Sequence, residues 1–120
     1  MLEPIECATP GIIAFDATGV ISEADYRNVI YLAAEGMLKT HGELRILMRL
    51  GPGFSHYSRR AALLDAMMAN EYGPHIRRFA VVSDFEGLKH LAKRVAETVG
   101  VDFGLFRLNQ MDEALAWVAG

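Results

Sequence analysis

The feature that most constrains the fold of this chain is the regular alternation of β-rich runs with amphipathic stretches of helical period. The main β-rich runs lie at 11–18, 44–50, 78–84 and 102–108, and residues 2–8 form a weaker run suited to a sheet edge. A helical stretch follows each main run. Strands joined by helices run parallel through right-handed crossovers, whereas the first two runs are close enough to form a hairpin. The sequence therefore predicts a single α/β domain over residues 1–120, with a mixed five-stranded sheet and about four helices.

The helical stretches are bounded by residues that cap helices. Ser22 and Asp25 match a capping box, and Gly42 suits a left-handed cap at the end of the first helix. Polar N-cap residues are also expected at the other helix starts: Ser58, Asp84 and Asn109. The apolar positions expected to face the sheet are Tyr26, Val29, Ile30, Ala33, Met37 and Leu38 in the first helix, Leu63, Leu64, Met67 and Met68 in the second, and Leu88, Leu91, Ala92, Val95 and Val99 in the third.

Charge and composition exclude several classes of partner. Twelve Lys and Arg against fifteen Asp and Glu give a net charge of −3, which offers nucleic acid no general attraction. Every apolar run is broken by charge well before the roughly 20 residues that a membrane span needs, so integral membrane association is not expected. The single cysteine, Cys7, fits a reducing compartment, and the N-terminal acids and prolines do not resemble a secretory signal. The expected location is the cytoplasm.

Residues that could bind a metal or a cofactor, or catalyse a reaction, do not occur at the spacings that are characteristic of such sites. None of the four histidines stands at metal-ligand spacing from a Cys, a Glu or another His, so no metal site is expected. The glycines at 51 and 53 lack the further glycines and the lysine of a nucleotide-binding loop, so no cofactor is expected either. General acid–base chemistry needs converging titratable groups, and the sequence indicates none. The chain is therefore expected to bind something without catalysing a reaction.

The segment 51–60, GPGFSHYSRR, is the most informative stretch for binding because it joins the end of a central strand to the start of a helix. Ligands of open α/β sheets bind at that edge. With Ser58 as N-cap, free N–H groups would lie beside Arg59 and Arg60 and could hold an anion or a phosphoserine. Ordinary capping beside two solvated arginines explains the same residues.

An apolar cluster is expected beside this segment, where the second helix meets the sheet. Its members would be Phe54, Tyr57, Leu64, Met67, Met68, Tyr72 and Phe85. Methionine adapts its shape to irregular partners, which favours a ligand cavity. Apolar stripes of helical period are more often plain core, and that alternative stays open.

Four stretches together resemble the SpoIIAA-like family of STAS-type domains, named for the anti-sigma factor antagonists whose fold they share. They are GIIAFDATGVISEADYRNVI, LRILMRL, RRFAVVSDFEGLKHLAK and MDEALAWVAG, in the order of that family. The resemblance implies a regulatory or binding domain with no associated reaction. Antagonists of this type carry a phosphorylatable serine in an Asp-Ser-Ser-Gly-like turn. That turn is absent here, Ser55 and Ser58 occupy the equivalent region, and Arg49 stands where an acid is more typical.

Two functions follow as hypotheses. In the first, the domain docks a protein partner through the segment 51–60 and is regulated by modification of Ser55 or Ser58. In the second, it carries or senses a small apolar or lipid-like ligand between the second helix and the sheet, with Arg59 or Arg60 on an acidic head group. The residues predicted to contact the partner or ligand are Phe54, Ser55, Tyr57, Ser58, Arg59, Arg60, Met67, Met68 and Phe85. An edge strand at 2–8 could also pair with a second copy to form a homodimer.

Overall fold

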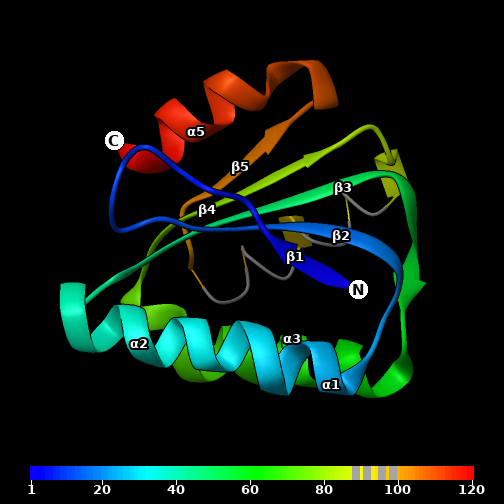
Figure 1. Ribbon diagram of the computed structural model, residues 1–120, viewed down its shortest axis with the longest axis horizontal. Helices are drawn as coiled ribbons and strands as arrows, with labels where there is room; N and C mark the ends of the chain where they lie inside the picture. The colour runs from blue at the N-terminus through cyan, green and yellow to red at the C-terminus, as the bar shows by residue number, and fades with distance from the viewer. Residues whose placement is uncertain (88–89, 91–92, 95–96, 98–99) are drawn as a thin grey trace.

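The strands of the sheet lie in the same order in space as in the chain. The computed structural model describes residues 1–87, 90, 93–94, 97 and 100–120 (Figure 1). The sheet contains β1 (Leu2–Pro4), β2 (Ile13–Ile21), β3 (Leu44–Tyr57), β4 (Ile76–Ser83) and β5 (Phe103–Phe106). β1 pairs antiparallel with β2, and every other neighbouring pair is parallel. The predicted mixed five-stranded α/β sheet is confirmed.

Helices cover both faces of the sheet. α1 (Glu23–Asp25), η1 (Tyr26–Ile30) and α2 (Tyr31–His41) form one continuous helical segment, in which η1 is a π-helix. This segment and α3 (Arg59–Tyr72) lie against one face, and α5 (Met111–Ala119) lies against the other (Figure 1). We call α1, η1, α2 and α3 the helical layer. The apolar positions predicted for the third helix, Leu88, Leu91, Ala92, Val95 and Val99, lie outside the described residues.

The capping predictions are confirmed at three helix ends. Ser22 and Asp25 form a reciprocal capping box, the backbone of Gly42 is left-handed with φ +72°, and Ser58 Oγ accepts a hydrogen bond from Ala61 N at 3.1 Å. The prediction that the last helix begins at Asn109 is wrong. A short 3₁₀ turn, η3 (Leu108–Gln110), precedes α5, because the Gln110 side chain accepts a hydrogen bond from Arg107 N at 2.9 Å and holds this tighter turn.

Two separate cores fill the space between the sheet and its helices. The alternation of side chains along the strands sends Phe15 and Met48 into the core under the helical layer, and Ala14 and Leu47 into the core under α5. The apolar stripe predicted for the first helix packs against the first of these cores. Because the core under the helical layer contains most of the buried aromatic residues, it is the part of the fold in which a binding cavity could form.

The prediction that β3 ends before Gly51 is wrong, because the strand continues through Tyr57. Pairing with β4 stops at Leu50 opposite Ser83, whereas pairing with β2 resumes after a bulge and ends at Tyr57 opposite Ile21. A Cβ on Gly51 would lie 2.7 Å from Arg49 Nη1, so a larger residue at this bulge would have to displace the end of the Arg49 side chain. The Gly-Pro-Gly signal therefore marks an irregular extension of the strand and not a loop.

Candidate functional site

The end of β3 and the start of α3 meet the end of β2 at one corner of the sheet. Ser58 N donates a hydrogen bond to Ile21 O at 2.8 Å, which fixes the first turn of α3 to the last residue of β2. This corner, the carboxyl end of the parallel strands, is where the sequence places the binding segment 51–60.

Four aromatic rings form a row that runs from the surface into the core at this corner. Phe85 is 43% exposed and its ring centroid lies 6.3 Å from that of Phe54. Phe54 lies 5.5 Å from Tyr57, and Tyr57 lies 6.1 Å from Tyr26, which is 1% exposed. The rings meet at 61–63°, in the edge-to-face arrangement that aromatic pairs prefer. Three predicted site residues, Phe54, Tyr57 and Phe85, are thereby brought together.

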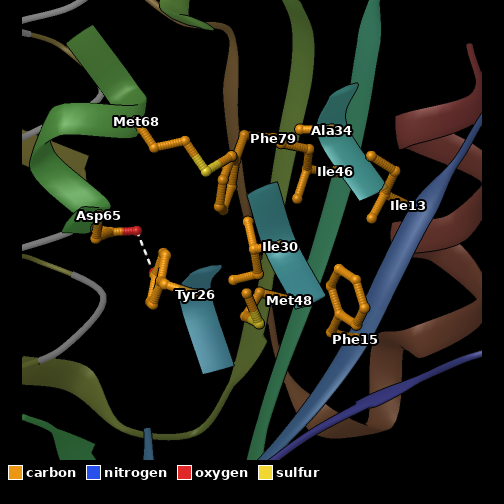
Figure 2. Close-up of a pocket in the computed structure, with 10 residues that line it drawn as sticks. All are labelled: Ile13, Phe15, Tyr26, Ile30, Ala34, Ile46, Met48, Asp65, Met68 and Phe79. Carbon is orange, nitrogen blue, oxygen red and sulfur yellow. Dashed lines mark hydrogen bonds between the residues drawn. The ribbon is translucent and has the colours of Figure 1, made fainter. Parts of the chain in front are cut away.

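The inner end of the row is polar. The Tyr26 hydroxyl on η1 donates a hydrogen bond to Asp65 Oδ1 on α3 (Figure 2). Burial raises the pKa of the Asp65 carboxyl above its usual range, and the hydrogen bond from Tyr26 only partly opposes this effect. Burial and the charge of Asp65 also raise the pKa of both Tyr26 and Tyr57. The three side chains lie together and their ionisations influence one another, and the ion pairs found among the described residues include none of them.

A narrow cavity lies between the helical layer and the sheet, directly beside this group (Figure 2). Its volume is about 10 Å³, which is room for about one water molecule. The lining is apolar except for Tyr26 and Asp65. The residues that line it are Ile13, Phe15, Tyr26, Ile30, Ala34, Ile46, Met48, Asp65, Met68 and Phe79.

Of the two leucines and two methionines predicted for the sheet-facing side of α3, two are buried and two are exposed. Leu64 and Met68 are buried, but Leu63 is 61% exposed and Met67 is 52% exposed, so their assignment to the sheet-facing surface is wrong. The buried stripe of α3 is Ala61, Leu64, Met68 and Tyr72. Its spacings of three and four residues leave the other two side chains about 100° away around the helix. Of the predicted contact residues, Met68 alone lines the cavity.

Four polar side chains and one aromatic ring near the corner are exposed. We call these residues the junction surface: Ser55, His56, Arg59, Arg60 and Phe85. Ser55 Oγ lies 2.8 Å from His56 Nδ1. Arg60 is 80% exposed and pairs with Glu23 at 3.4 Å. Neither Arg59 nor Arg60 lines the cavity, so the predicted contact between these arginines and the head group of an enclosed ligand is not supported by this arrangement.

Sequence reasoning missed Tyr26 and Asp65 as site residues. The sequence analysis places Tyr26 in the apolar stripe of the first helix and assigns no role to Asp65. The sequence does contain one indication that Asp65 is close to the core. Asp65 directly follows Leu64 and stands three residues before Met68, so it lies beside the buried stripe of α3. Only the packing of α3 against η1 shows that this carboxyl turns inward.

A second hollow lies at the amino ends of β2 and β3, and its lining is partly polar and partly apolar. Its volume is about 280 Å³, and it is lined by Thr9, Pro10, Gly11, Ile12, His41, Glu43, Arg45 and Ala119. Arg45 is already bonded there, to Glu43 at 2.9 Å and to the Val118 carbonyl at 2.8 Å. Within the described part of the chain, no three His, Cys, Asp or Glu side chains are grouped so that they could hold a metal ion. Among the same residues, no helix has both the length and the apolar character to cross a membrane.

Comparisons with known proteins give a fold and a family for this chain. The sequence matches no curated protein. A crystal structure of an uncharacterised protein from Shewanella loihica PV-4, described as a member of the DUF3478 family with a SpoIIAA-like fold, superimposes with a TM-score of 0.74. The two chains are 19% identical, and the match covers 98% of this chain and 92% of that chain. The SpoIIAA-like family model matches residues 12–119, which is nearly the whole chain, and the protein therefore belongs to the SpoIIAA-like family.

Proposed function

We propose that this chain is a non-enzymatic regulatory domain of STAS type that docks a protein partner through the junction surface. The observation that carries the proposal is the exposed ring of Phe85, which lies on the buried ring of Phe54 and is therefore held in place at the surface. An exposed aromatic side chain with a rigid support is a suitable anchor for a partner, because little conformational entropy is lost when it is covered. The single cysteine and the cytoplasmic setting it suggests fit an intracellular partner.

The chemistry of the partner follows from the charges of the junction surface. Arg60 and Arg27 both pair with Glu23, at 3.4 Å and 3.1 Å. Arg59 is exposed and forms no ion pair with any residue that the structure describes. The partner should therefore present an apolar side chain to Phe85 and a carboxylate or phosphate to Arg59.

Regulation by phosphorylation is better suited to Ser55 than to Ser58. The Ser58 hydroxyl is partly buried and accepts the hydrogen bond that caps α3, whereas Ser55 is exposed and bonds only to the neighbouring His56 among the described residues. A phosphate on Ser55 would add charge to the junction surface without removing a helix cap. It would repel the acidic partner proposed above.

A test combines crosslinking with affinity measurement. A photoreactive residue placed at Phe85 should capture the partner, and the same residue placed at Leu105, an exposed position on β5, should not. The captured protein is then purified and titrated against Phe85→Ser, Arg59→Glu and the control Leu105→Ser. We expect the first two to weaken binding by roughly tenfold or more and the control to match wild type. Equal affinity for all four proteins would overturn the proposal.

A second candidate function, binding of a small apolar ligand, is favoured by the cavity between the helical layer and the sheet. This cavity lies where Met68 faces the sheet and is enclosed mainly by apolar side chains. At about 10 Å³ it is smaller than such a ligand, so binding requires Met68 and its helix to shift outward.

Native mass spectrometry of freshly purified protein tests this second candidate. A small-molecule adduct should be present in wild type and in Met67→Trp, whose side chain is exposed, and absent from Met68→Trp, in which the larger ring fills the cavity. Circular dichroism establishes that both variants are folded. An adduct that survives Met68→Trp would contradict the cavity as its site.

Self-association through β1 stays a prediction. β1 is an edge strand of three residues that ends in Pro4, so a second copy could add only a short antiparallel pairing. Sedimentation measurements on wild type and on a variant that lacks residues 1–4 would test it.

A further inference from the structure

The hollow at the amino ends of β2 and β3 has both the space and the free hydrogen-bonding groups that a small ligand needs. We infer that it binds a small zwitterion with the chemistry of an aliphatic α-amino acid, whose carboxylate lies on Arg45 and whose ammonium group lies on Glu43. This hollow shares no residue with the junction surface or with the cavity beside Asp65, so neither function proposed above depends on it.

The size of the hollow suits a molecule as small as an amino acid. Its volume of about 280 Å³ lies near the lower end of the roughly 300–1,000 Å³ that is usual for small-molecule sites. Its walls are the segment 9–12, the start of β3 and the last residues of α2 and α5, His41 and Ala119. These two helix ends lie at the same end of the sheet (Figure 1).

One wall of the hollow depends on a close approach between Gly11 and His41. The backbone of Gly11 is left-handed with φ +88°, and a Cβ at this position would lie 3.2 Å from His41 Cδ2. A residue with a side chain would be strained in this conformation and would push against the imidazole ring. The segment before β2 is therefore packed directly against the end of α2, and this wall is formed before any ligand arrives.

Arg45 offers free donors from a guanidinium group that is already fixed in orientation. Its Nε donates a hydrogen bond to Glu43 at 2.9 Å, and its Nη1 donates to the Val118 carbonyl at 2.8 Å. A guanidinium has five N–H donors, and Nη2 forms no hydrogen bond with any residue that the structure describes. A ligand carboxylate can accept from these remaining donors, and such charge-assisted bonds are among the stronger ones.

Glu43 and His41 offer partners for an ammonium group beside that carboxylate. Only Oε2 of Glu43 is bonded to Arg45, and within the described part of the chain Oε1 has no hydrogen bond. The Nδ1 atom of His41 lies 2.9 Å from the Thr40 hydroxyl, whereas its Nε2 has no described partner. An ammonium group has three N–H donors, so it can bond to Glu43 and still have donors for a second acceptor.

The balance of charges in the hollow favours a ligand that carries both signs. Arg45 is positive, Glu43 is negative, and the C-terminal ends of α2 and α5 add partial negative charge. A plain carboxylate would be repelled by Glu43, and a plain amine would be repelled by Arg45. The rest of the lining includes Pro10, Ile12 and Ala119, which suit an aliphatic side chain.

Three probes with one aliphatic chain test the inference: leucine, 4-methylpentanoate, which lacks the ammonium group, and 3-methylbutylamine, which lacks the carboxylate. Each is titrated into wild type, Arg45→Gln, Glu43→Gln and the control Arg27→Gln, with calorimetry and thermal unfolding as readouts. Arg27 also pairs with a glutamate, Glu23, but lies outside the hollow. At ten times its Kd, leucine should raise the Tm of wild type by about 5 °C, and both analogues should bind at least roughly tenfold more weakly.

The variants should change affinity in different ways. Arg45→Gln should weaken leucine roughly tenfold to a hundredfold, and Arg27→Gln should leave it unchanged. Glu43→Gln should weaken leucine but strengthen 4-methylpentanoate, because the repulsion is removed. This change of preference decides the question even if Arg45→Gln fails to fold without its bond to Val118.

Amide chemical shifts locate the bound probe. Leucine should shift the amides of Gly11, Glu43 and Ala119 and leave that of Phe85 on the junction surface unchanged. Shifts confined to the junction surface, or no binding of leucine at millimolar concentration, would overturn the inference. Equal affinity of wild type for leucine and 4-methylpentanoate, or an unchanged preference in Glu43→Gln, would overturn it as well. None of these outcomes bears on partner capture at Phe85.

Discussion

Tyr26 of η1 donates its hydroxyl hydrogen to the Asp65 carboxyl of α3, and this bond joins the two parts of the helical layer. Both residues lie beside the cavity, and within the described part of the chain neither forms an ion pair. The bond therefore satisfies the carboxyl as a hydrogen-bond acceptor without neutralising its charge. For this reason, removing the charge of Asp65 and removing the hydroxyl of Tyr26 should change the stability of the protein in opposite directions.

Replacing Asp65 by Asn should stabilise the protein at neutral pH. Burial raises the pKa of Asp65 in the folded protein above its value in the unfolded chain. The contribution of Asp65 to the stability of the protein is therefore complete below the unfolded pKa, and it is lost as the pH rises through the folded pKa. An amide can still accept the Tyr26 hydrogen bond but carries no charge. We expect a gain of the order of 1 kcal/mol at neutral pH, measured by urea unfolding from pH 4 to 8. Asp112→Asn serves as the control, and a loss of stability in Asp65→Asn would contradict this account.

Replacing Tyr26 by Phe should destabilise the protein, because it leaves the Asp65 carboxyl without its hydrogen-bond donor. The expected loss is about 1–3 kcal/mol in the free energy of unfolding at neutral pH. In the double variant Tyr26→Phe, Asp65→Leu the loss should be largely recovered, since both polar groups are then removed together. Additive losses in this double-mutant cycle would show that the two side chains do not interact.

Gly104 on β5 should not tolerate even a methyl group. A Cβ at this position would lie 2.8 Å from the ring of Trp117 on α5 and 2.9 Å from the ring of Phe106, so Gly104→Ala must displace one or both of these packed rings. We expect a loss of about 1–3 kcal/mol. Gly36→Ala is the matched control, since no atom lies within 4 Å of the new Cβ on α2, and it should be neutral or stabilise by about 0.5–1 kcal/mol. Thermal unfolding of the two variants distinguishes crowding from a general effect of glycine replacement.

Ser58→Ala should lower the free energy of unfolding by about 1 kcal/mol, because α3 loses its N-cap. Ser58→Asp should retain most of the wild-type stability, because aspartate also caps helices. Ser55→Ala should leave stability within about 0.5 kcal/mol of wild type, since this hydroxyl is exposed. Chemical denaturation of all three variants checks the order. If Ser58→Ala weakens partner binding only in proportion to its loss of folded protein, Ser58 acts through the helix and not through the interface.

The sequence was sufficient for features that depend on local patterns. The capping box at Ser22, the left-handed Gly42 and the stripe that contains Tyr26 follow from short-range periodicity and from backbone requirements. The mixed sheet also follows, because a hairpin and successive crossovers allow few other arrangements.

The sequence was not sufficient to predict features that depend on contacts between segments far apart in the chain. The extension of β3 depends on the length of β2 across the bulge, and Gly51 and Pro52 in isolation favour a turn. The exposure of Met67 depends on which side of α3 meets the sheet, since four neighbouring apolar residues fit more than one helix orientation. The pairing of Asp65 with Tyr26 spans 39 residues, and no local pattern indicates it.

The unequal lengths of β3 and β4 also limit how the domain can open. Beyond Leu50, β3 is paired along one side only, with β2, and its last residue leads directly into α3 through the Ser58–Ile21 hydrogen bond. Because the Ser58 end of α3 is held by this bond, we expect separation of α3 from the sheet to begin at its other end, near Gly73 and Pro74. Hydrogen exchange should reflect this gradient, with amides near Tyr72 exchanging before those near Ala62.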